Sequence, residues 1–193
     1  MKKILKLTLL VTLLTNLLTA ETIFDLSQQH FANSLARKGV GARYNLPKVY
    51  VSTALQYANG QYWVINASSQ NFQVEIKNAI DDWSVSYDMS YYLYNNHHPM
   101  RLTDATGKTF TVSFAYNKIY VNSKVIYTSS SYLEERTSAI VTLTKMGNKI
   151  QVSVAGYTNA LYDTNFGRLK FVTIDAQSDE YGKDTLNGLT ISH

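Results

Sequence analysis

The sequence contains no cysteine and only two prolines. The absence of cysteine excludes disulfides, thiolate catalysis, iron–sulfur clusters and zinc sites with cysteine ligands. Proline interrupts the hydrogen-bond ladder of a central strand, so its scarcity suits a chain that is mostly sheet. Tyrosine, by contrast, occurs 15 times, and it favours strands and amphipathic contact surfaces.

Residues 1–20 are predicted to form a secretory signal peptide. The segment begins with three lysines, continues with an apolar run over residues 7–18 that only Thr and Asn interrupt, and ends at Thr19 and Ala20. The apolar run is short against the roughly 20 residues that a bilayer-spanning helix needs. We therefore expect an exported protein, periplasmic or extracellular, with no membrane span in the mature chain. The lysine-rich start and the absence of cysteine favour a bacterial envelope protein.

Residues 21–193 are expected to form one domain. Segment 1–20 carries three lysines and no acidic residue, so the net charge falls from +4 for the whole chain to +1 without it. Nucleic-acid binding requires a basic patch, and this balance gives no support for a nucleic-acid partner. A domain of this length buries an adequate core without disulfides.

The stretch 82–94, DWSVSYDMSYYLY, alternates along its whole length. Its apolar residues, beginning with Trp83, fall on one side, and its serines, Asp88 and two of its tyrosines fall on the other. A period of two predicts a long strand with one buried and one polar face. A buried face of this length requires a second sheet to cover it.

The rest of the chain predicts short strands separated by turns. The turn signals include Asn59-Gly60 and Gly147-Asn148. Residues 27–37 fit either a short N-terminal helix or an extended segment. The fold class predicted is therefore all-β, an antiparallel two-sheet sandwich. The further strands are expected at 22–26, 48–55, 61–65, 72–76, 100–103, 109–116, 119–121, 125–128, 138–145, 150–154, 168–174 and 186–192.

Three pieces between Trp83 and His193 carry a resemblance: WSVSYDMSYYLY, the paired run IVTLTKMGNKIQVSVAGY, and the closing DTLNGLTIS. Together they resemble the concanavalin A-like, laminin-G-like jelly rolls. In such folds the closing strand returns beside the first one, and residues 23–26 would be its neighbour. The resemblance implies a carbohydrate- or protein-binding module or a glycan-cleaving enzyme, among which fold alone does not decide.

The carboxylate pattern does not favour an enzyme. Glycoside hydrolysis needs two carboxylates about 5–10 Å apart, and glucanases of this fold carry acidic residues at alternating positions on one strand. Between Ser84 and Tyr94, the polar side of the 82–94 strand has a single acidic residue, Asp88. The adjacent pairs at 134–135 and 179–180 would point apart on a strand. We expect no catalytic residue, and a glycan hydrolase remains an alternative.

The polar side of the 82–94 strand is the candidate ligand-binding site. Aromatic rings stack on the apolar face of a sugar, and a carboxylate accepts hydrogen bonds from its hydroxyls. The other interpretation is a solvated sheet face whose tyrosines pair across strands. The candidate residues are Ser86, Asp88, Ser90, Tyr92 and Tyr94.

A cluster of acidic residues near the C-terminus is a weak candidate for a calcium site. Calcium takes six to eight oxygen ligands, and laminin-G-like modules commonly bind it near a rim. The other interpretation is a solvated loop, and no other cofactor is expected. The candidate ligands are Asp175, Asp179 and Asp184.

These features together favour an exported, non-enzymatic binding module that recognises a glycan or a protein at the bacterial envelope. One alternative is a periplasmic protein-interaction partner, such as an inhibitor or an assembly component. The other is the glycan hydrolase considered above.

Overall fold

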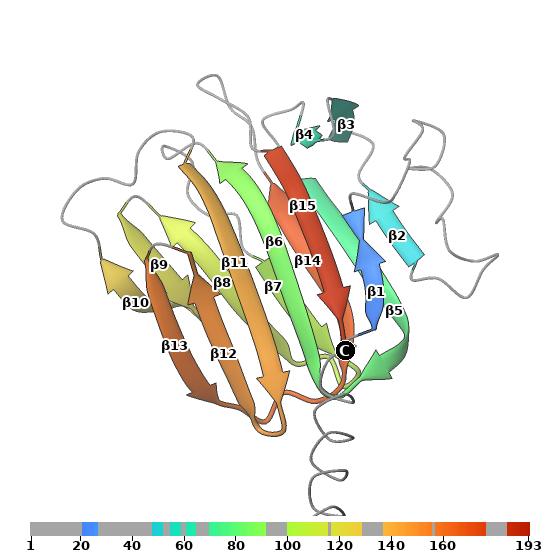
Figure 1. Ribbon diagram of the computed structural model, residues 1–193, viewed down its shortest axis with the longest axis vertical. Coiled ribbons are helices and arrows are strands. Elements are labelled where there is room, and N and C mark those ends of the chain that lie inside the picture. Colours follow the sequence, from blue (N-terminus) through green and yellow to red (C-terminus); the bar gives the residue numbers. More distant parts are fainter. Residues whose placement is uncertain are drawn as a thin grey trace, which may run out of the picture.

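The protein is a sandwich of two antiparallel sheets (Figure 1). The computed structural model describes residues 21–26, 48–51, 55–58, 61–64, 70–91, 100–115, 117–128, 137–155, 157–176 and 185–193. Among these residues, no helix has the length and apolar character needed to cross a membrane.

Fifteen strands make up the two sheets of the described chain. In order they are β1 (Thr22–Asp25), β2 (Lys48–Val51), β3 (Leu55–Ala58), β4 (Gln61–Val64), β5 (Gln70–Ile80), β6 (Trp83–Tyr91), β7 (Met100–Asp104), β8 (Thr109–Ala115), β9 (Lys118–Val121), β10 (Lys124–Thr128), β11 (Thr137–Met146), β12 (Lys149–Val154), β13 (Thr158–Asp163), β14 (Leu169–Ala176) and β15 (Thr185–Ser192).

One sheet has eight strands in the order β13-β12-β11-β6-β15-β4-β3, with β1 also paired to β15. The other has seven strands in the order β10-β9-β8-β7-β14-β5-β2. Figure 1 shows the first sheet in front of the second, with the long strands β6, β11 and β15 at its centre. Strands of one hairpin are neighbours, whereas β6 pairs with β15, which lies about a hundred residues further along the chain.

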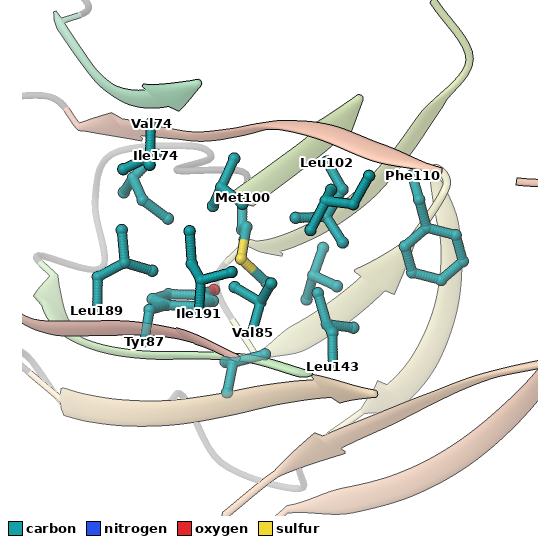
Figure 2. Packing of buried hydrophobic residues seen from close by; sticks show 14 of the residues in the cluster. Val74, Val85, Tyr87, Met100, Leu102, Phe110, Leu143, Ile174, Leu189 and Ile191 are labelled. Carbon is teal, nitrogen blue, oxygen red and sulfur yellow. The ribbon is translucent and has the colours of Figure 1, made fainter. Parts of the chain in front are cut away.

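The core lies between the sheets. Figure 2 shows Val74, Met100, Leu102, Phe110 and Ile174 of the seven-stranded sheet pointing toward side chains of the other sheet. All of them are at most 2 % exposed. Because both inner faces are apolar along several strands, each sheet removes the other's buried face from water, which is the main force that stabilises a sandwich. The facing side chains labelled there are Val85, Tyr87, Leu143, Leu189 and Ile191.

The alternation of the 82–94 stretch is confirmed where the structure describes it. Trp83, Val85 and Tyr87 are buried, and the residues between them are partly exposed. The predicted hairpin of the paired run is β11 with β12. The closing strand β15 lies beside β6, and β1 is its neighbour near the chain ends, as the resemblance implied.

Two details of the strand prediction are wrong. The predicted strand over 48–55 includes β2 and the first residue of β3, which belong to different sheets: β2 joins the seven-stranded sheet and β3 joins the eight-stranded one. The strand β13 was not predicted, since it is an edge strand on which Asn159 and Leu161 are exposed, so its sequence lacks a continuous apolar side. The predicted helix or extended segment at 27–37 lies outside the described residues.

Candidate functional site

The outer side of β6 carries short polar side chains. Ser84, Ser86 and Asp88 are partly exposed and alternate with buried residues that face the core. Side chains of one strand point alternately to the two faces of a sheet, so these three residues share the outer face. They lie at the centre of the eight-stranded sheet, with β11 on one side and β15 on the other.

The hydroxyls of β6 pair across the strands. Ser84 and Thr144 share a hydrogen bond of 3.2 Å, and Ser86 and Thr142 share one of 3.1 Å. On the other side of β6, Ser192 and Thr190 lie directly opposite Ser84 and Ser86. Cross-strand hydroxyl pairs of this kind stabilise a sheet modestly and order its surface. We call these six residues the hydroxyl face: Ser84, Ser86, Thr142, Thr144, Thr190 and Ser192.

Asp88 adds a negative charge next to the hydroxyl face. Asn187 Nδ2 donates to its Oδ1 at 3.5 Å. Its neighbour on β11 is Ile140, which is 49 % exposed. Its neighbour on β15 is Gly188. Neither of these directly opposite residues is acidic, and Asp25 of β1 lies one strand further across the sheet, opposite Thr190.

Gly188 leaves room beside Asp88. A Cβ at position 188 would lie 3.9 Å from Asp88 Cβ, which is an ordinary contact, and the backbone there is not left-handed. Its φ is therefore not one that requires glycine, although the residue ends a register shift of β15 that begins at Leu186. A glycine costs conformational entropy within a strand. What it provides is the absence of a side chain, and we call the resulting space the Gly188 notch.

The structure brings two of the predicted ligand-binding residues together. Ser86 and Asp88 lie on one face as expected, two positions apart on β6. The backbone of Ser90 continues β6 and pairs with Ser138, but its side chain lies outside the description. Tyr92 and Tyr94 lie outside the described residues. The hydroxyls of β11 and β15 were missed, because cross-strand register is not visible in the sequence.

The predicted calcium ligands fall mostly outside the described part. Asp175 belongs to β14 and pairs with Asn71, although its side chain is not described. Asp179 and Asp184 lie outside the described residues. Within the described ranges, no group of three or more His, Asp or Glu side chains has the arrangement of a metal site.

The outer face of the seven-stranded sheet has a different character. Gln73 Nε2 donates to Thr173 Oγ1 at 3.0 Å, which joins β5 to β14. Lys170 Nζ lies 3.2 Å from Glu75 Oε1 and also donates to the carbonyl oxygen of Ile76 at 2.9 Å. This face therefore contains an ion pair between strands, whereas the six residues of the hydroxyl face are uncharged.

The comparison with known proteins supports the fold alone. No known family profile matches the chain, and no curated protein sequence matches it. Among solved structures, an Emp46p carbohydrate recognition domain in its metal-free form superposes with a TM-score of 0.58 at 8 % identity, covering 90 % of this chain and 98 % of that one.

Two further solved structures are similar to this chain over most of its length. The CBM2 module of the Lactobacillus casei BL23 phage J-1 evolved Dit superposes with a TM-score of 0.59 at 10 % identity, covering 90 % of this chain and 95 % of that one. The apo Crh5 transglycosylase superposes with a TM-score of 0.62 at 8 % identity, covering 91 % and 85 %.

The two stacked antiparallel sheets and these superpositions define the class of fold. The chain is a concanavalin A-like jelly-roll sandwich, which confirms the resemblance drawn from its sequence. Proteins of this class include both binding domains and enzymes.

Proposed function

We propose that this protein is a non-enzymatic carbohydrate-binding module, and that the hydroxyl face and Asp88 contact the glycan. The observation that carries the proposal is a partly exposed carboxylate that lies beside the Gly188 notch and next to the six hydroxyls of the hydroxyl face. Sugars present many hydroxyls that donate and accept hydrogen bonds. A carboxylate, an amide and an ordered set of hydroxyls offer matching partners without a net electrostatic requirement.

The solved structures support this class of ligand without deciding it. One similar chain is a carbohydrate recognition domain and another is a transglycosylase. A shared fold hosts unrelated functions, so the site has to carry the argument. The non-enzymatic form is favoured because the two residues directly opposite Asp88, Ile140 and Gly188, are not acidic. A glycan hydrolase remains an alternative that would use residues elsewhere.

A protein-interaction role is less well supported. Docking surfaces usually present a contiguous apolar patch. Among the described residues, the exposed large apolar side chains are distributed over both sheets on β10, β11 and β13. They are Val125, Ile140, Met146 and Leu161. An inhibitor or assembly role would therefore need a surface formed by other residues.

We also propose that the protein is exported to the bacterial envelope, in the periplasm or outside the cell. The support is the sequence of residues 1–20, with its basic start, apolar run and small-residue end. An exported binding module would meet envelope or extracellular glycans as its natural partners.

The Gly188 notch provides the sharpest test of the proposed function. Gly188→Thr fills the notch with a residue that favours strands, so the free energy of unfolding should stay the same or rise by about 0.5–1 kcal/mol. Glycan binding should fall at least tenfold, because the new side chain covers the space beside Asp88. Wild type and variant would be compared on a glycan array, with urea unfolding measured in parallel.

The matched control is Asn159→Thr, which places the same residue type on the exposed side of β13, away from β6. It should bind glycans as the wild type does. The double variant Tyr92→Ala with Tyr94→Ala tests the predicted aromatic part of the site. A wild-type protein that binds no glycan, or binding that survives Gly188→Thr unchanged, contradicts the proposal.

A further inference from the structure

A groove of about 500 Å³ opens at one end of the sandwich. It forms where the start of β8, the β9–β10 turn, the β11–β12 turn and the segment after β13 come together. In Figure 1 the end of β13 and the β11–β12 turn lie at the lower edge of the molecule. The volume falls within the range of about 300–1,000 Å³ that is usual for small-molecule sites.

The walls of the groove are rich in amides. Asn122, Asn148 and Asn165 all line it and all are exposed. Each carboxamide offers two N–H donors and one acceptor oxygen. The three side chains come from three separate connections between strands, and only the tertiary structure brings them together.

Asn122 is held in a defined orientation. Its side-chain Oδ1 accepts a hydrogen bond from the backbone N–H of Thr111 at 2.9 Å. The backbone N–H of Asn122 donates to the backbone carbonyl oxygen of Thr111 at 2.9 Å. Its φ of 47° is left-handed, a conformation that asparagine tolerates better than most residues. Because the amide oxygen is used on β8, the side chain presents its NH₂ group to a ligand.

The segments around the groove are fixed to one another. The Thr164 N–H donates to the Asn148 carbonyl oxygen at 2.8 Å. Lys108 Nζ donates to the carbonyl oxygen of Asn165 at 3.3 Å. The buried Asp104 accepts from the backbone N–H groups of Lys108 and Gly167, at 2.9 and 2.7 Å, and so joins the two sides behind the groove. A site whose walls are already ordered loses less entropy when a ligand binds.

The floor of the groove is aromatic. Phe110 and Phe166 line it and are 2 % and 5 % exposed. Phe110 packs edge-on against Tyr162, with ring centroids 6.0 Å apart, and Phe166 packs in the same way against Trp83 at 5.9 Å. The floor is therefore a packed part of the core, and the polar groups stand around it.

We propose that this groove binds a single neutral sugar ring. An apolar ligand would bury amide groups without partners, which is costly, whereas a sugar supplies a hydroxyl to each amide. The two charged residues that line the groove, Lys108 and Asp163, have opposite signs. Asp163 also lies 3.6 Å from Lys149 and is 82 % exposed. The residues that line the groove therefore carry no net charge, which favours a neutral ligand.

The groove is separate from the site of the proposed function. Asp88 lies opposite residue 140 of β11, and the pairing of Asp163 through β12 leads to residue 146 of β11. The two carboxylates are therefore six residues apart along the strand direction and three strands apart across the sheet. These steps amount to about 25 Å. The inference rests on the proposed function for the class of ligand, but it concerns a second contact. A glycan end in the groove would be recognised independently of the hydroxyl face.

The test uses the methyl glycosides of glucose, galactose, mannose and N-acetylglucosamine as probes, with binding followed by NMR titration. At least one should shift the side-chain amide signals of Asn122 and Asn165. Asn122→Asp keeps the acceptor oxygen for Thr111 but removes the NH₂ donors. Asn165→Ala removes an exposed side-chain amide but keeps the backbone carbonyl oxygen that accepts from Lys108. Each variant should weaken binding at least fivefold.

Two controls distinguish the possible results. Asn159→Ala removes an exposed amide from β13 outside the groove, and Gly188→Thr fills the notch on the outer face. In both variants the methyl glycosides should shift the amide signals of Asn122 and Asn165 as they do in the wild type. If Gly188→Thr abolishes monosaccharide binding and the groove variants retain it, the groove is not the sugar site. The proposed function would then still stand. If methyl glucuronide binds more tightly than every neutral probe, the proposal that the ligand is a neutral sugar is wrong. A wild-type protein that binds neither these probes nor any glycan on an array contradicts both proposals.

Discussion

At the scale of single residues, Asp104 is a buried carboxylate that accepts four hydrogen bonds. It is 2 % exposed, and its Oδ1 accepts from the N–H of Thr106 at 2.8 Å and the hydroxyl of Thr106 at 2.7 Å, in addition to Lys108 N–H. Its Oδ2 accepts from Gly167 N–H. Burial by itself raises the pKa of Asp104, but the hydrogen bonds from Thr106, Gly167 and Lys108 together hold the pKa below its ordinary value.

This arrangement predicts a loss of stability for Asp104→Asn. The amide NH₂ would replace one oxygen and set a donor against a donor, so the free energy of unfolding at pH 7 should fall by about 2–3 kcal/mol. A carboxyl whose pKa is lowered in the folded state stabilises the protein above its unfolded pKa of about 3.9, and this contribution disappears as the pH falls through the folded-state value. Urea unfolding at pH 7 and pH 3 should therefore show a wild-type advantage that shrinks in acid.

The exposed carboxylate Asp163 supplies the control, since Asp163→Asn should change stability by less than about 0.5 kcal/mol. Equal unfolding midpoints for wild type and Asp104→Asn at pH 7 would show that the carboxylate is not needed to join the two segments. Gly167 belongs to the same arrangement, because a Cβ there would lie 3.0 Å from Asp104 Oδ2.

At the scale of elements, β1 is a short strand that contributes the buried ring of Phe24 to the core. It pairs with β15, and beyond the strands Glu21 and His193 exchange two backbone hydrogen bonds of 2.7 and 3.1 Å. Phe24 is 3 % exposed and its ring lies 6.2 Å from that of Phe72 on the opposite sheet. The strand therefore links the two sheets through a side chain as well as extending one of them.

We expect Phe24→Ala to lower the free energy of unfolding by about 3–4 kcal/mol, since it removes a buried ring and leaves a cavity between the sheets. Thr22→Ala, at an exposed position of the same strand, should change it by less than about 0.5 kcal/mol. Urea unfolding followed by tryptophan fluorescence would measure both. If Phe24→Ala unfolds at the same urea concentration as the wild type, β1 does not contribute to the core in solution.

At the scale of the whole molecule, every described strand lies within residues 21–193. Cleavage after Ala20 would remove none of these strands, and β1 begins one residue after the new N-terminus. The signal-peptide hypothesis is therefore compatible with a complete sandwich in the mature protein. The pairing of Glu21 with His193 would place the new amino group beside the last strand.

Expression of the full chain in a bacterial host should yield a mature protein that begins at Glu21. Mass spectrometry of the envelope and culture fractions measures the N-terminus and the location together, with a chain lacking residues 1–20 as the cytoplasmic control. An intact chain starting at Met1 and confined to the cytoplasm would rule out export. The mature protein should fold as the control does, because the sandwich needs no disulfide.

Local alternation was enough to predict most of the strands and the fold class. In a strand with one buried face, apolar residues alternate with polar ones in the sequence, as Trp83, Val85 and Tyr87 do. The prediction failed at β13, whose edge position leaves Leu161 exposed, so no apolar side marks it. It also failed to divide 48–55, because the sheet that a strand joins depends on partners far along the chain.

The sequence by itself determined that the chain builds two covered sheets and that Ser86 and Asp88 share a face. Only the tertiary structure decided what surrounds them, because cross-strand register joins Asp88 to Gly188 a hundred positions away. The groove has the same origin, since its amides belong to connections between strands that meet only when the sheets are stacked. Side-chain period is a local property of the backbone, whereas a site is formed by contacts between segments that the sequence leaves far apart.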